Sequence, residues 1–305
     1  MYNCQMTDQA YIEETRRMLE SLLPAERIRT VDQDYIRGLL KRRNPRAHKG
    51  CFGHALLYAG SHGMAGAAVL SARACLRSGV GLLTVCTPPV NNDIIQISVP
   101  EAMVLQTDEM YAYSDLSRYS AVGAGPGLGK GESQTAILDK LLKSISCPMV
   151  LDADALNIIS QNCHMLDYIP SGSVITPHPG ELARLTEKTD DFARMTSNAI
   201  GLACRKGLTL VVKGAPTVTV LPDRKAYINT TGNAGMATGG SGDVLTGIVL
   251  ALLAQGYSAE DSAIIAVYLH GLAGDMAAAS LSQTAMTSAD IISYLPKVWL
   301  NIEKV

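Results

Sequence analysis

Residues 54–87 have the sequence HALLYAGSHGMAGAAVLSARACLRSGVGLLTVCT. The apolar run 54–59 predicts a short buried strand, the alanine-rich stretch 64–78 predicts a helix, and the apolar run 82–87 predicts a second strand. A strand, a helix and a strand in direct succession form a crossover unit, which connects parallel strands. The segment therefore predicts a parallel sheet with helices packed on it.

The same alternation continues along the chain. Further strands are expected at 119–123, 148–151, 173–176 and 208–213, with helices at 132–143, 155–160, 180–185 and 192–206. A hairpin is expected at 217–221 and 225–229, followed by helices at 243–254, 259–280 and 288–300. We therefore predict a doubly wound, mostly parallel α/β sheet with helices on both faces and a small antiparallel hairpin. Residues 30–305 are expected to form this domain, and residues 1–29 a helical extension.

Composition excludes several classes of protein. The 305 residues include 26 Lys and Arg against 28 Asp and Glu, and the net charge of −2 argues against an electrostatically driven nucleic-acid binder. Hydrophobic residues make up 47% and charged residues 18%, so the chain can build a large core, unlike a disordered protein. With 27 glycines but only 2 Phe, 12 Tyr and 1 Trp, the composition favours an α/β enzyme over an antiparallel sandwich.

Neither an export signal nor a membrane span is expected. Residues 1–20 carry several charged side chains and lack the apolar core of a signal peptide. Apolar stretches such as 248–254 are shorter than the roughly 18 to 20 residues that cross a bilayer. The cysteines are scattered, without a Cys-x-x-Cys pair, and favour reduced thiols in a cytoplasmic protein. They are Cys4, Cys51, Cys75, Cys86, Cys147, Cys163 and Cys204.

Chemically unusual residues follow the ends of the predicted strands. Ligands of open α/β sheets bind beyond the carboxyl ends of the strands, so these loops are expected to meet at one site. One glycine-rich loop alone could be structural, because strand-to-helix connections use glycine routinely, but several on one rim favour a site. The loops are 60–66, 123–129, 152–157, 176–181, 213–217 and 233–243.

The last of these loops predicts a phosphate site. Gly240 and Gly242 lie where an apolar helix begins, which leaves backbone N–H groups free to bind an anion. Asp243 lies in the first turn, where a carboxylate can simply complement the helix dipole or cap the helix. A carboxylate beside a phosphate is unfavourable, so we favour a base that takes a proton from a hydroxyl attacking phosphorus. The glycines around 123–131 match neither the Walker nor the Rossmann spacing.

His178 is a second candidate for a ligand contact. It lies between Pro177 and Pro179, which stiffen the backbone, and Glu181 follows three residues later. A loop contact with Glu181 as partner of a helix dipole is the alternative, and we favour the ligand contact. The chain has no His-x-x-x-His or similar cluster, so no tightly bound metal is expected, and Mg²⁺ would arrive with nucleotide phosphates.

A basic run at 41–49 leaves two possibilities open. It could contact phosphate, or it could form a solvated loop, which we favour. Its basic residues are Lys41, Arg42, Arg43, Arg46, His48 and Lys49.

At these motifs the chain resembles the ADP/ATP-dependent NAD(P)H-hydrate dehydratases, which have a ribokinase-like fold. The resemblance extends from about Arg27 to the C-terminus. The segments DADALN at 152–157 and TPHPGE at 176–181 are specific together, whereas GSGD at 240–243 is a pattern shared by sugar and vitamin kinases of this fold. The other matching segments are 49–54, 63–68, 122–129, 213–217 and 233–243.

The resemblance implies a hydro-lyase that repairs hydrated NADH or NADPH, in which water has added to the nicotinamide ring. ADP or ATP, with Mg²⁺, would phosphorylate the ring hydroxyl of the S-epimer, and phosphate would then be eliminated. Many relatives carry a fused N-terminal epimerase domain, which about 30 residues cannot hold, so we expect this chain to act on one epimer unaided. Stand-alone members typically use ADP and form tetramers, and a homotetramer is expected by analogy.

Roles for individual residues follow from the matched motifs. Asp243 is expected to be the catalytic base, with the N–H groups of Gly240 to Gly242 stabilising the developing charge. Contacts to the hydrated dinucleotide are expected from Ala67, Gly127, His178 and Asp243. Contacts to the adenine nucleotide are expected from Lys213, Gly214, Ala215, Pro216, Thr217 and Gly242. Supporting roles are expected for Asp152, Asn157, Glu181, Asn233 and Gly240.

Two other functions fit part of the pattern. A kinase for a vitamin precursor, such as hydroxyethylthiazole or hydroxymethylpyrimidine, would share Gly242 and Asp243 but would leave His178 and 152–157 unexplained. A stable phosphorylated product would favour this kinase. A non-catalytic nucleotide sensor would need the phosphate loop but no base at position 243, and binding without turnover would favour it.

Overall fold

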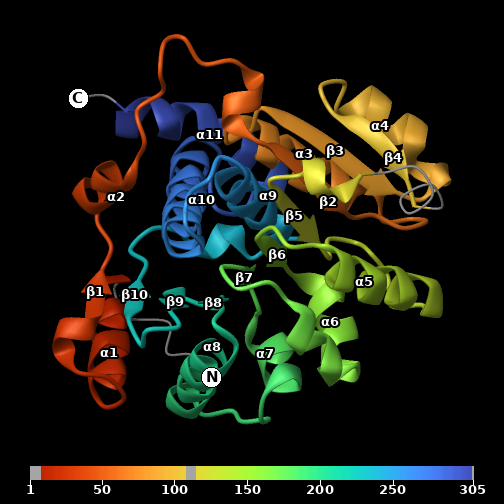
Figure 1. Cartoon of the computed structure of the whole chain (residues 1–305). Coiled ribbons are helices and arrows are strands. Elements are labelled where there is room, and N and C mark those ends of the chain that lie inside the picture. Colours follow the sequence, from red (N-terminus) through yellow and green to blue (C-terminus); the bar gives the residue numbers. More distant parts are fainter. Residues whose placement is uncertain (1–7, 108–114, 304–305) are drawn as a thin grey trace.

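The computed structural model describes residues 8–107 and 115–303. Within them, ten short strands form one sheet, with helices on both faces (Figure 1). The strands are β1 (Ile28–Thr30), β2 (His54–Tyr58), β3 (Leu82–Thr87), β4 (Met103–Gln106), β5 (Ala121–Ala124), β6 (Met149–Leu151), β7 (Val174–Ile175), β8 (Thr209–Val212), β9 (Val218–Val220) and β10 (Ala226–Ile228). Their order across the sheet is β1-β10-β9-β8-β7-β6-β5-β2-β3-β4.

The sheet is parallel except around β9, which runs antiparallel to both β8 and β10. All the other strand pairs in the described part of the chain are parallel. The predicted doubly wound, mostly parallel sheet with a small antiparallel part is therefore confirmed. Its hairpin is β9 and β10, as the two short runs around residues 222–224 predict.

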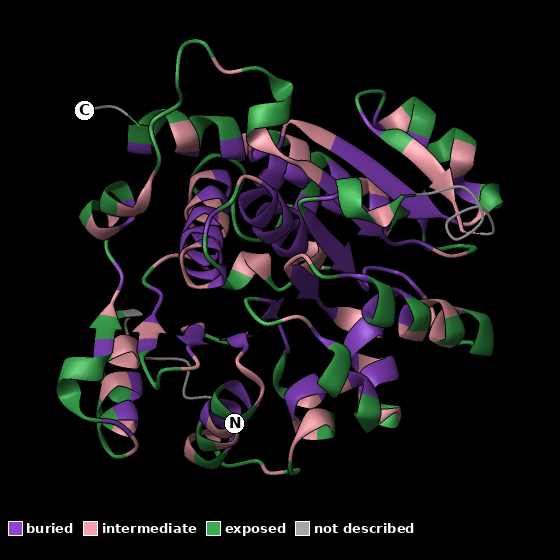
Figure 2. Cartoon of the chain, in the orientation of Figure 1, coloured by how far each residue is buried: buried purple, intermediate pink, exposed green. Residues whose placement is uncertain are grey.

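Side chains on the central strands alternate between two hydrophobic cores, one on each face of the sheet. On β2, Ala55 and Leu57 belong to one core, and Leu56 and Tyr58 belong to the other. The first core also contains side chains of α2 (Gln33–Leu39), α3 (Ala65–Arg77), α4 (Asn92–Ser98), α9 (Ser241–Ala254), α10 (Ala259–Leu281) and α11 (Ser288–Glu303). The second contains side chains of α1 (Asp8–Glu20), α5 (Glu132–Ser144), α6 (Ala153–Gln161), α7 (Pro179–Leu185) and α8 (Phe192–Lys206). Figure 2 shows the buried strands and central helices.

The order of the strands reverses between β2 and β5. β2 pairs with β3 on one side and with β5 on the other, so later strands extend the sheet in both directions. This is a topological switch point, outside which ligands bind in open α/β sheets. The glycine-rich loops 60–66 and 123–129, which follow β2 and β5, flank this point.

Four elements, β1, α2, α4 and β4, lie outside the sequence-based predictions. The domain boundary expected between residues 29 and 30 falls inside β1, which pairs with β10 at the edge of the sheet. Leu19 and Leu23 are buried in the same core as α8. In this structure the segment before residue 30 therefore packs on the sheet and adds a strand to it.

Helix α10 contradicts the expectation that the apolar stretches of this chain are too short to cross a bilayer. It has 23 residues and is long and apolar enough to cross a membrane by length and composition. Just over half of its most apolar window, 56%, is buried inside the protein, and it packs against α9 and α11. We therefore assign α10 to the core of the fold.

None of the cysteines in the described part of the chain forms a disulfide bond. Cys75 and Cys86 are buried, whereas Cys51, Cys163 and Cys204 are exposed. Cys4 lies outside the described residues. Free thiols agree with the expectation of an undisulfided chain at these positions.

Candidate functional site

The N-terminus of α9 has the geometry of an anion site. Gly240 adopts φ +90° just before the helix, and a Cβ there would lie 2.4 Å from Leu70 Cδ1, so this position requires glycine. No side chain caps α9, and the first N–H groups of a helix have no partner within it. Ser241, Gly242 and Asp243 form the first turn. The amides of Gly242 and Asp243 are therefore available to a phosphate, as the sequence predicts, whereas the N–H of Ser241 donates a hydrogen bond of 3.4 Å to the carbonyl of Thr238.

Asp243 is a carboxyl group held in a half-buried position. Burial, with the nearby carboxylates of Asp152 and Asp154, raises its pKa to about 6, against the opposing effect of Lys213. The backbone carbonyl of Asp243 accepts a hydrogen bond of 2.8 Å from Ser71 Oγ, which fastens this turn to α3. A carboxyl group with this pKa can accept a proton near neutral pH.

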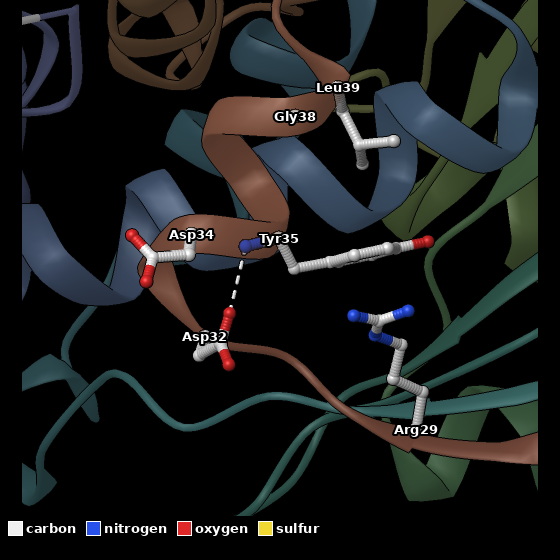
Figure 3. Close-up of a pocket in the computed structure, with 6 residues that line it drawn as sticks. All are labelled: Arg29, Asp32, Asp34, Tyr35, Gly38 and Leu39. Carbon is white, nitrogen blue, oxygen red and sulfur yellow. Dashed lines mark hydrogen bonds between the residues drawn. The ribbon is translucent and has the colours of Figure 1, made fainter. Parts of the chain in front are cut away.

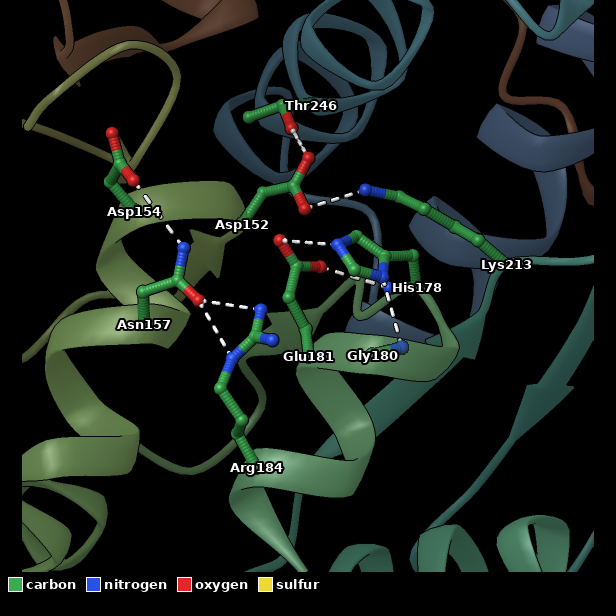
Figure 4. Close-up of polar contacts among 9 residues, drawn as sticks. All are labelled: Asp152, Asp154, Asn157, His178, Gly180, Glu181, Arg184, Lys213 and Thr246. Atoms are coloured by element: carbon green, nitrogen blue, oxygen red, sulfur yellow. Dashed lines mark hydrogen bonds and ion pairs between the residues drawn. The ribbon is translucent and has the colours of Figure 1, made fainter. Parts of the chain in front are cut away.

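Next to this turn lies a partly buried ion pair, which is drawn in Figure 4. Asp152, directly after β6, accepts a hydrogen bond of 2.6 Å from Lys213 Nζ on Oδ1 and one of 2.9 Å from Thr246 Oγ1 on Oδ2. Its side chain is 2% exposed and that of Lys213 is 22% exposed. A Cβ on Gly242 would lie 3.3 Å from Lys213 Nζ, so the pair adjoins the anion site directly.

Asp154 and Asn157 connect three of the predicted loops. Asp154 Oδ2 accepts a hydrogen bond of 2.9 Å from the backbone N–H of Gly129, and its Oδ1 accepts one of 3.4 Å from Asn157 Nδ2. Asn157 Oδ1 in turn accepts hydrogen bonds from Arg184 Nε and Nη2, at 3.1 and 2.8 Å. The loop after β5 is thus linked through α6 to α7.

His178 caps helix α7. Its Nδ1 accepts a hydrogen bond of 3.0 Å from the N–H of Gly180, while Glu181 Oε2 accepts one of 2.9 Å from the N–H of His178. The pKa of His178 is lowered by burial, then by Lys213 and Arg184, and that of the buried Glu181 is raised by burial and by Asp152. The cap requires an unprotonated Nδ1, so the remaining ring proton lies on Nε2, 3.4 Å from Glu181 Oε1.

Ala67 and Gly127 lie against each other at the switch point. A Cβ on Gly127 would come within 2.9 Å of Ala67 Cβ, and Gly127 has φ +57°. Ser61 Oγ donates a hydrogen bond of 2.8 Å to the carbonyl of Gly127, which joins the loops after β2 and β5. The structure therefore brings together two residues predicted to contact the dinucleotide.

The loop 213–217 lies next to the His178 loop. The N–H of Lys213 donates a hydrogen bond of 3.0 Å to the carbonyl of Pro177. Thr217 Oγ1 donates one of 3.0 Å to the carbonyl of Gly214, which closes the loop on itself. Gly214 and Ala215 are exposed, and Pro216 and Thr217 are half-buried. Of the residues predicted to contact the nucleotide, Lys213 and Gly242 lie next to each other.

Asn233 is hydrogen-bonded to helix α10. Its Nδ2 donates a hydrogen bond of 2.9 Å to Asp275 Oδ1, and its Oδ1 accepts one of 2.9 Å from the N–H of Gly235. On the same helix, His270 Nε2 lies 3.3 Å from Ser241 Oγ, and burial lowers its pKa to about 4. His270 is therefore neutral at physiological pH and steadies the start of α9.

Sequence reasoning missed several partners of the site residues. Thr246 lies in a mostly apolar stretch of α9, and His270 and Asp275 lie in a mostly apolar stretch of α10. This contrast with their neighbours is the signal that the sequence offers for them. Asp154 lies inside the 152–157 segment, which the sequence marks as part of the site. Arg184 resembles any surface arginine until its contact with Asn157 is seen.

The basic run does not reach this site through Lys41 or Arg43. Lys41 Nζ donates a hydrogen bond of 2.6 Å to the carbonyl of Gly256, and Arg43 Nη2 donates one of 2.7 Å to that of Gly79. Both glycines follow the C-terminal ends of helices, α9 and α3, where cations are favourable. Arg43 also stacks 4.0 Å above the Phe52 ring.

The pocket drawn in Figure 3 is separate from the predicted site. It lies at the start of α2, where the guanidinium of Arg29 stacks 3.8 Å above the Tyr35 ring. Its lining is Arg29, Asp32, Asp34, Tyr35, Gly38 and Leu39, none of which is a predicted site residue.

Comparison with known proteins agrees with the motifs. A family model described as NAD(P)H-hydrate dehydratase matches residues 55–297. The ADP-dependent (S)-NAD(P)H-hydrate dehydratase of Bacillus subtilis is 33% identical over 89% of this chain and 98% of its own length. The bifunctional NAD(P)H-hydrate repair enzyme of Moorella thermoacetica is 37% identical over 88% of this chain. The chain spans about half, 53%, of that relative's length.

Solved structures place the fold. The ADP/ATP-dependent NAD(P)H-hydrate dehydratase from Bacillus subtilis, co-crystallized with ATP/Mg²⁺, matches 90% of this chain and 99% of its own, with a TM-score of 0.78 and 31% identity. Ribokinase from Thermotoga maritima and hydroxyethylthiazole kinase from Pyrococcus horikoshii reach TM-scores of 0.52 and 0.57 at 13% and 14% identity, which shows a shared fold alone. The predicted ribokinase-like fold is thus confirmed, and the chain belongs to the NAD(P)H-hydrate dehydratase family.

Proposed function

We propose that the chain removes water from the S-epimer of hydrated NADH or NADPH, with ADP or ATP as the phosphoryl donor. The observation that carries this proposal is the position of Asp243, whose carboxyl group has a raised pKa and stands in the first turn of an uncapped helix. A base is therefore beside amides that can bind the phosphoryl group it helps to transfer. Family membership supports the choice of substrate.

The first step is a phosphoryl transfer. Asp243 takes the proton from the ring hydroxyl, whose oxygen bonds to the terminal phosphorus of ADP or ATP while the bond to the departing AMP or ADP breaks. The N–H groups of Gly240 and Gly242 stabilise the charge that develops on the phosphoryl oxygens. Asp243 later returns its proton to solvent.

The second step is the elimination of phosphate. The lone pair of the ring nitrogen forms a carbon–nitrogen double bond as the carbon–oxygen bond breaks, and the electron pair of that bond leaves with phosphate. Phosphate is a far better leaving group than hydroxide. A proton then passes from the neighbouring ring carbon to the departing phosphate, which restores the ring double bond. The sum with ADP is one dinucleotide, one AMP and one phosphate per hydrate consumed.

The remaining roles follow the motif assignments. Ala67, Gly127 and His178 would contact the dinucleotide, and residues 213–217 with Gly242 would contact the adenine nucleotide. The support is that these loops adjoin one another around the switch point, through Ser61, Asp154 and the 213–217 loop.

Mg²⁺, the homotetramer and a cytoplasmic location belong to the proposal by analogy. In the described part of the chain, no three His, Cys, Asp or Glu side chains are grouped as metal ligands. Mg²⁺ would therefore be held mainly by nucleotide phosphates, as is usual for this ion, and we derive no step through it.

Replacing Asp243 with Asn tests the base directly. We expect Asp243→Asn to lower turnover of hydrated NADH at least 100-fold, because Asn cannot accept the proton, while ADP binding measured by calorimetry persists. Asp93→Asn is the matched control, since Asp93 is also a first-turn carboxylate but belongs to α4. Near-normal turnover by Asp243→Asn, with the control unaffected, would refute the assignment.

A further inference from the structure

The ion pair of Asp152 and Lys213 has a geometry that the proposed mechanism does not use. Both carboxylate oxygens of Asp152 are engaged, one by Lys213 Nζ and the other by Thr246 Oγ1. The backbone of Asp152 is equally fixed. Its N–H donates a hydrogen bond to the carbonyl of Ala124. Its carbonyl oxygen packs so closely on Gly125 that a Cβ added to Gly125 would lie only 1.8 Å from it. Asp152 is therefore a rigid anchor.

Lys213 is held between this anchor and the phosphate site. A Cβ added to Gly242 would lie 3.3 Å from Lys213 Nζ and 3.5 Å from Asp152 Oδ2. An ammonium group carries three protons, and Asp152 takes one of them. At least one of the others is available to an oxygen bound at the amides of α9. The side chain of Lys213 is partly exposed, so an incoming anion can reach it.

The pairing also removes an electrostatic obstacle. A lone buried carboxylate below the anion site would repel phosphate, but Lys213 balances its charge at 2.6 Å. Among the groups that act on Asp243, Lys213 is the cation and Asp152 and Asp154 are the anions. Asp152 and Lys213 also shift the pKa values of His178 and Glu181, and Lys213 shifts the pKa of His270 on α10. The Lys213 ammonium is therefore central to this cluster of charges.

We propose that Asp152 is a positioning residue that holds the Lys213 ammonium against the N-terminus of α9, where it contacts the phosphoryl group that is transferred. This inference rests on the proposed function. It assigns Lys213 to the terminal phosphate of the nucleotide, whereas its place in the 213–217 segment alone would allow a contact to any part of the nucleotide. The unusual backbone after the anchor, Ala153 at φ +48°, agrees with a constrained position.

Nucleotide binding tests Lys213 without reference to turnover. Calorimetry on the full chain should show that Lys213→Met weakens ADP binding roughly tenfold and leaves AMP binding unchanged, because only ADP carries the second phosphate. Lys297→Met, on the exposed face of α11, should change neither affinity. Equal weakening of ADP and AMP binding by Lys213→Met would overturn the assignment. If the wild-type chain binds ADP but never dehydrates the hydrate, the proposed function fails while this test still decides the role of Lys213.

Asp152 is tested by separating kcat from binding. Asp152→Asn keeps the size of the side chain but weakens its hold on Lys213, so we expect kcat to fall roughly tenfold while ADP affinity stays within about threefold of wild type. Its acid limb of kcat/KM should also move to lower pH, because Asp152 no longer raises the pKa of Asp243. A wild-type kcat would overturn the positioning role. If thermal unfolding shows that Asp152→Asn does not fold, Thr246→Val loosens the same anchor, and an unchanged kcat in that variant would equally overturn it.

Discussion

At the residue level, the carboxyl group of Asp243 is under opposing influences. Burial and two neighbouring aspartates favour its neutral form, whereas Lys213 favours its charged form, and the resulting pKa is about 6. A group with this pKa is ionised at neutral pH and can still hold a proton during the reaction. The fold thus keeps this carboxylate in surroundings that destabilise its charged form, as active sites commonly do.

The raised pKa predicts how activity and stability depend on pH. The folded chain binds this proton more tightly than the unfolded chain, so the free energy of unfolding decreases as pH rises from about 4 to about 6 and stays lower above that range. Asp243→Asn should therefore be more stable than wild type at pH 8, by about 2 to 3 kcal/mol, and equally stable near pH 3. Wild-type kcat/KM should fall about tenfold per pH unit below pH 6. Chemical denaturation at both pH values checks the stability claim, which equal stability at pH 8 would contradict.

His178 offers a prediction about which property of its ring matters. Asn can keep the cap on α7 but lacks the imidazole, so His178→Asn should retain its melting temperature and raise the KM for the hydrated dinucleotide about tenfold. His178→Ala should lose about 1 kcal/mol of stability as well, because the cap is removed. Steady-state kinetics and thermal unfolding separate the two effects. A fall in kcat of His178→Asn at unchanged KM would show instead that the ring moves a proton.

At the level of elements, α9 joins the site to the core. Its first turn provides Asp243 and the free amides, its second turn provides Thr246 for the anchor, and its remaining residues are buried. The other end of α9 meets the basic run through Lys41 and Gly256. One helix therefore has the proposed phosphate site at one end and a structural clamp at the other.

The contacts of Arg43 with Gly79 and Phe52 predict a loss of stability without a loss of activity when this side chain is removed. Arg43→Ala removes the hydrogen bond to Gly79 and the stacking on Phe52, and should lower the free energy of unfolding by about 1 kcal/mol. Turnover at saturating substrate should not change. Arg46→Ala, also in the exposed basic run, is the control for general effects of charge. Reduced ADP affinity in Arg43→Ala would instead indicate a phosphate contact.

How far the sequence predicts the structure differs between elements. The strands at 54–58 and 82–87 are recognisable because they are continuous apolar runs, as buried parallel strands are. β1 and β4 are short edge strands with partly exposed residues, and so they lack this signal. Asp243 and His178 stand out beside glycine and proline, but the pairing of Asp152 with Lys213 joins residues 61 positions apart and appears only in three dimensions.

For the whole molecule, a modest negative charge coexists with a proposed site for polyanions. The net charge of −2 excludes no nucleotide, since helix amides and one clamped lysine can supply local positive potential without a basic surface. The double winding brings loops from β2, β5, β6, β7 and β8 to the carboxyl edge of one sheet. Because kinases share this fold, the reaction that the chain catalyses must be identified from its products.

Product stoichiometry tests the central claim most directly. Purified chain is mixed with hydrated NADH and either ADP or ATP, and recovered dihydronicotinamide absorbance, nucleotide product and free phosphate are measured in the same reaction. The account predicts one NADH and one phosphate for each nucleotide consumed, with no lasting phosphorylated intermediate. A stable phosphorylated product, or binding of nucleotide with no recovery of NADH, would contradict it.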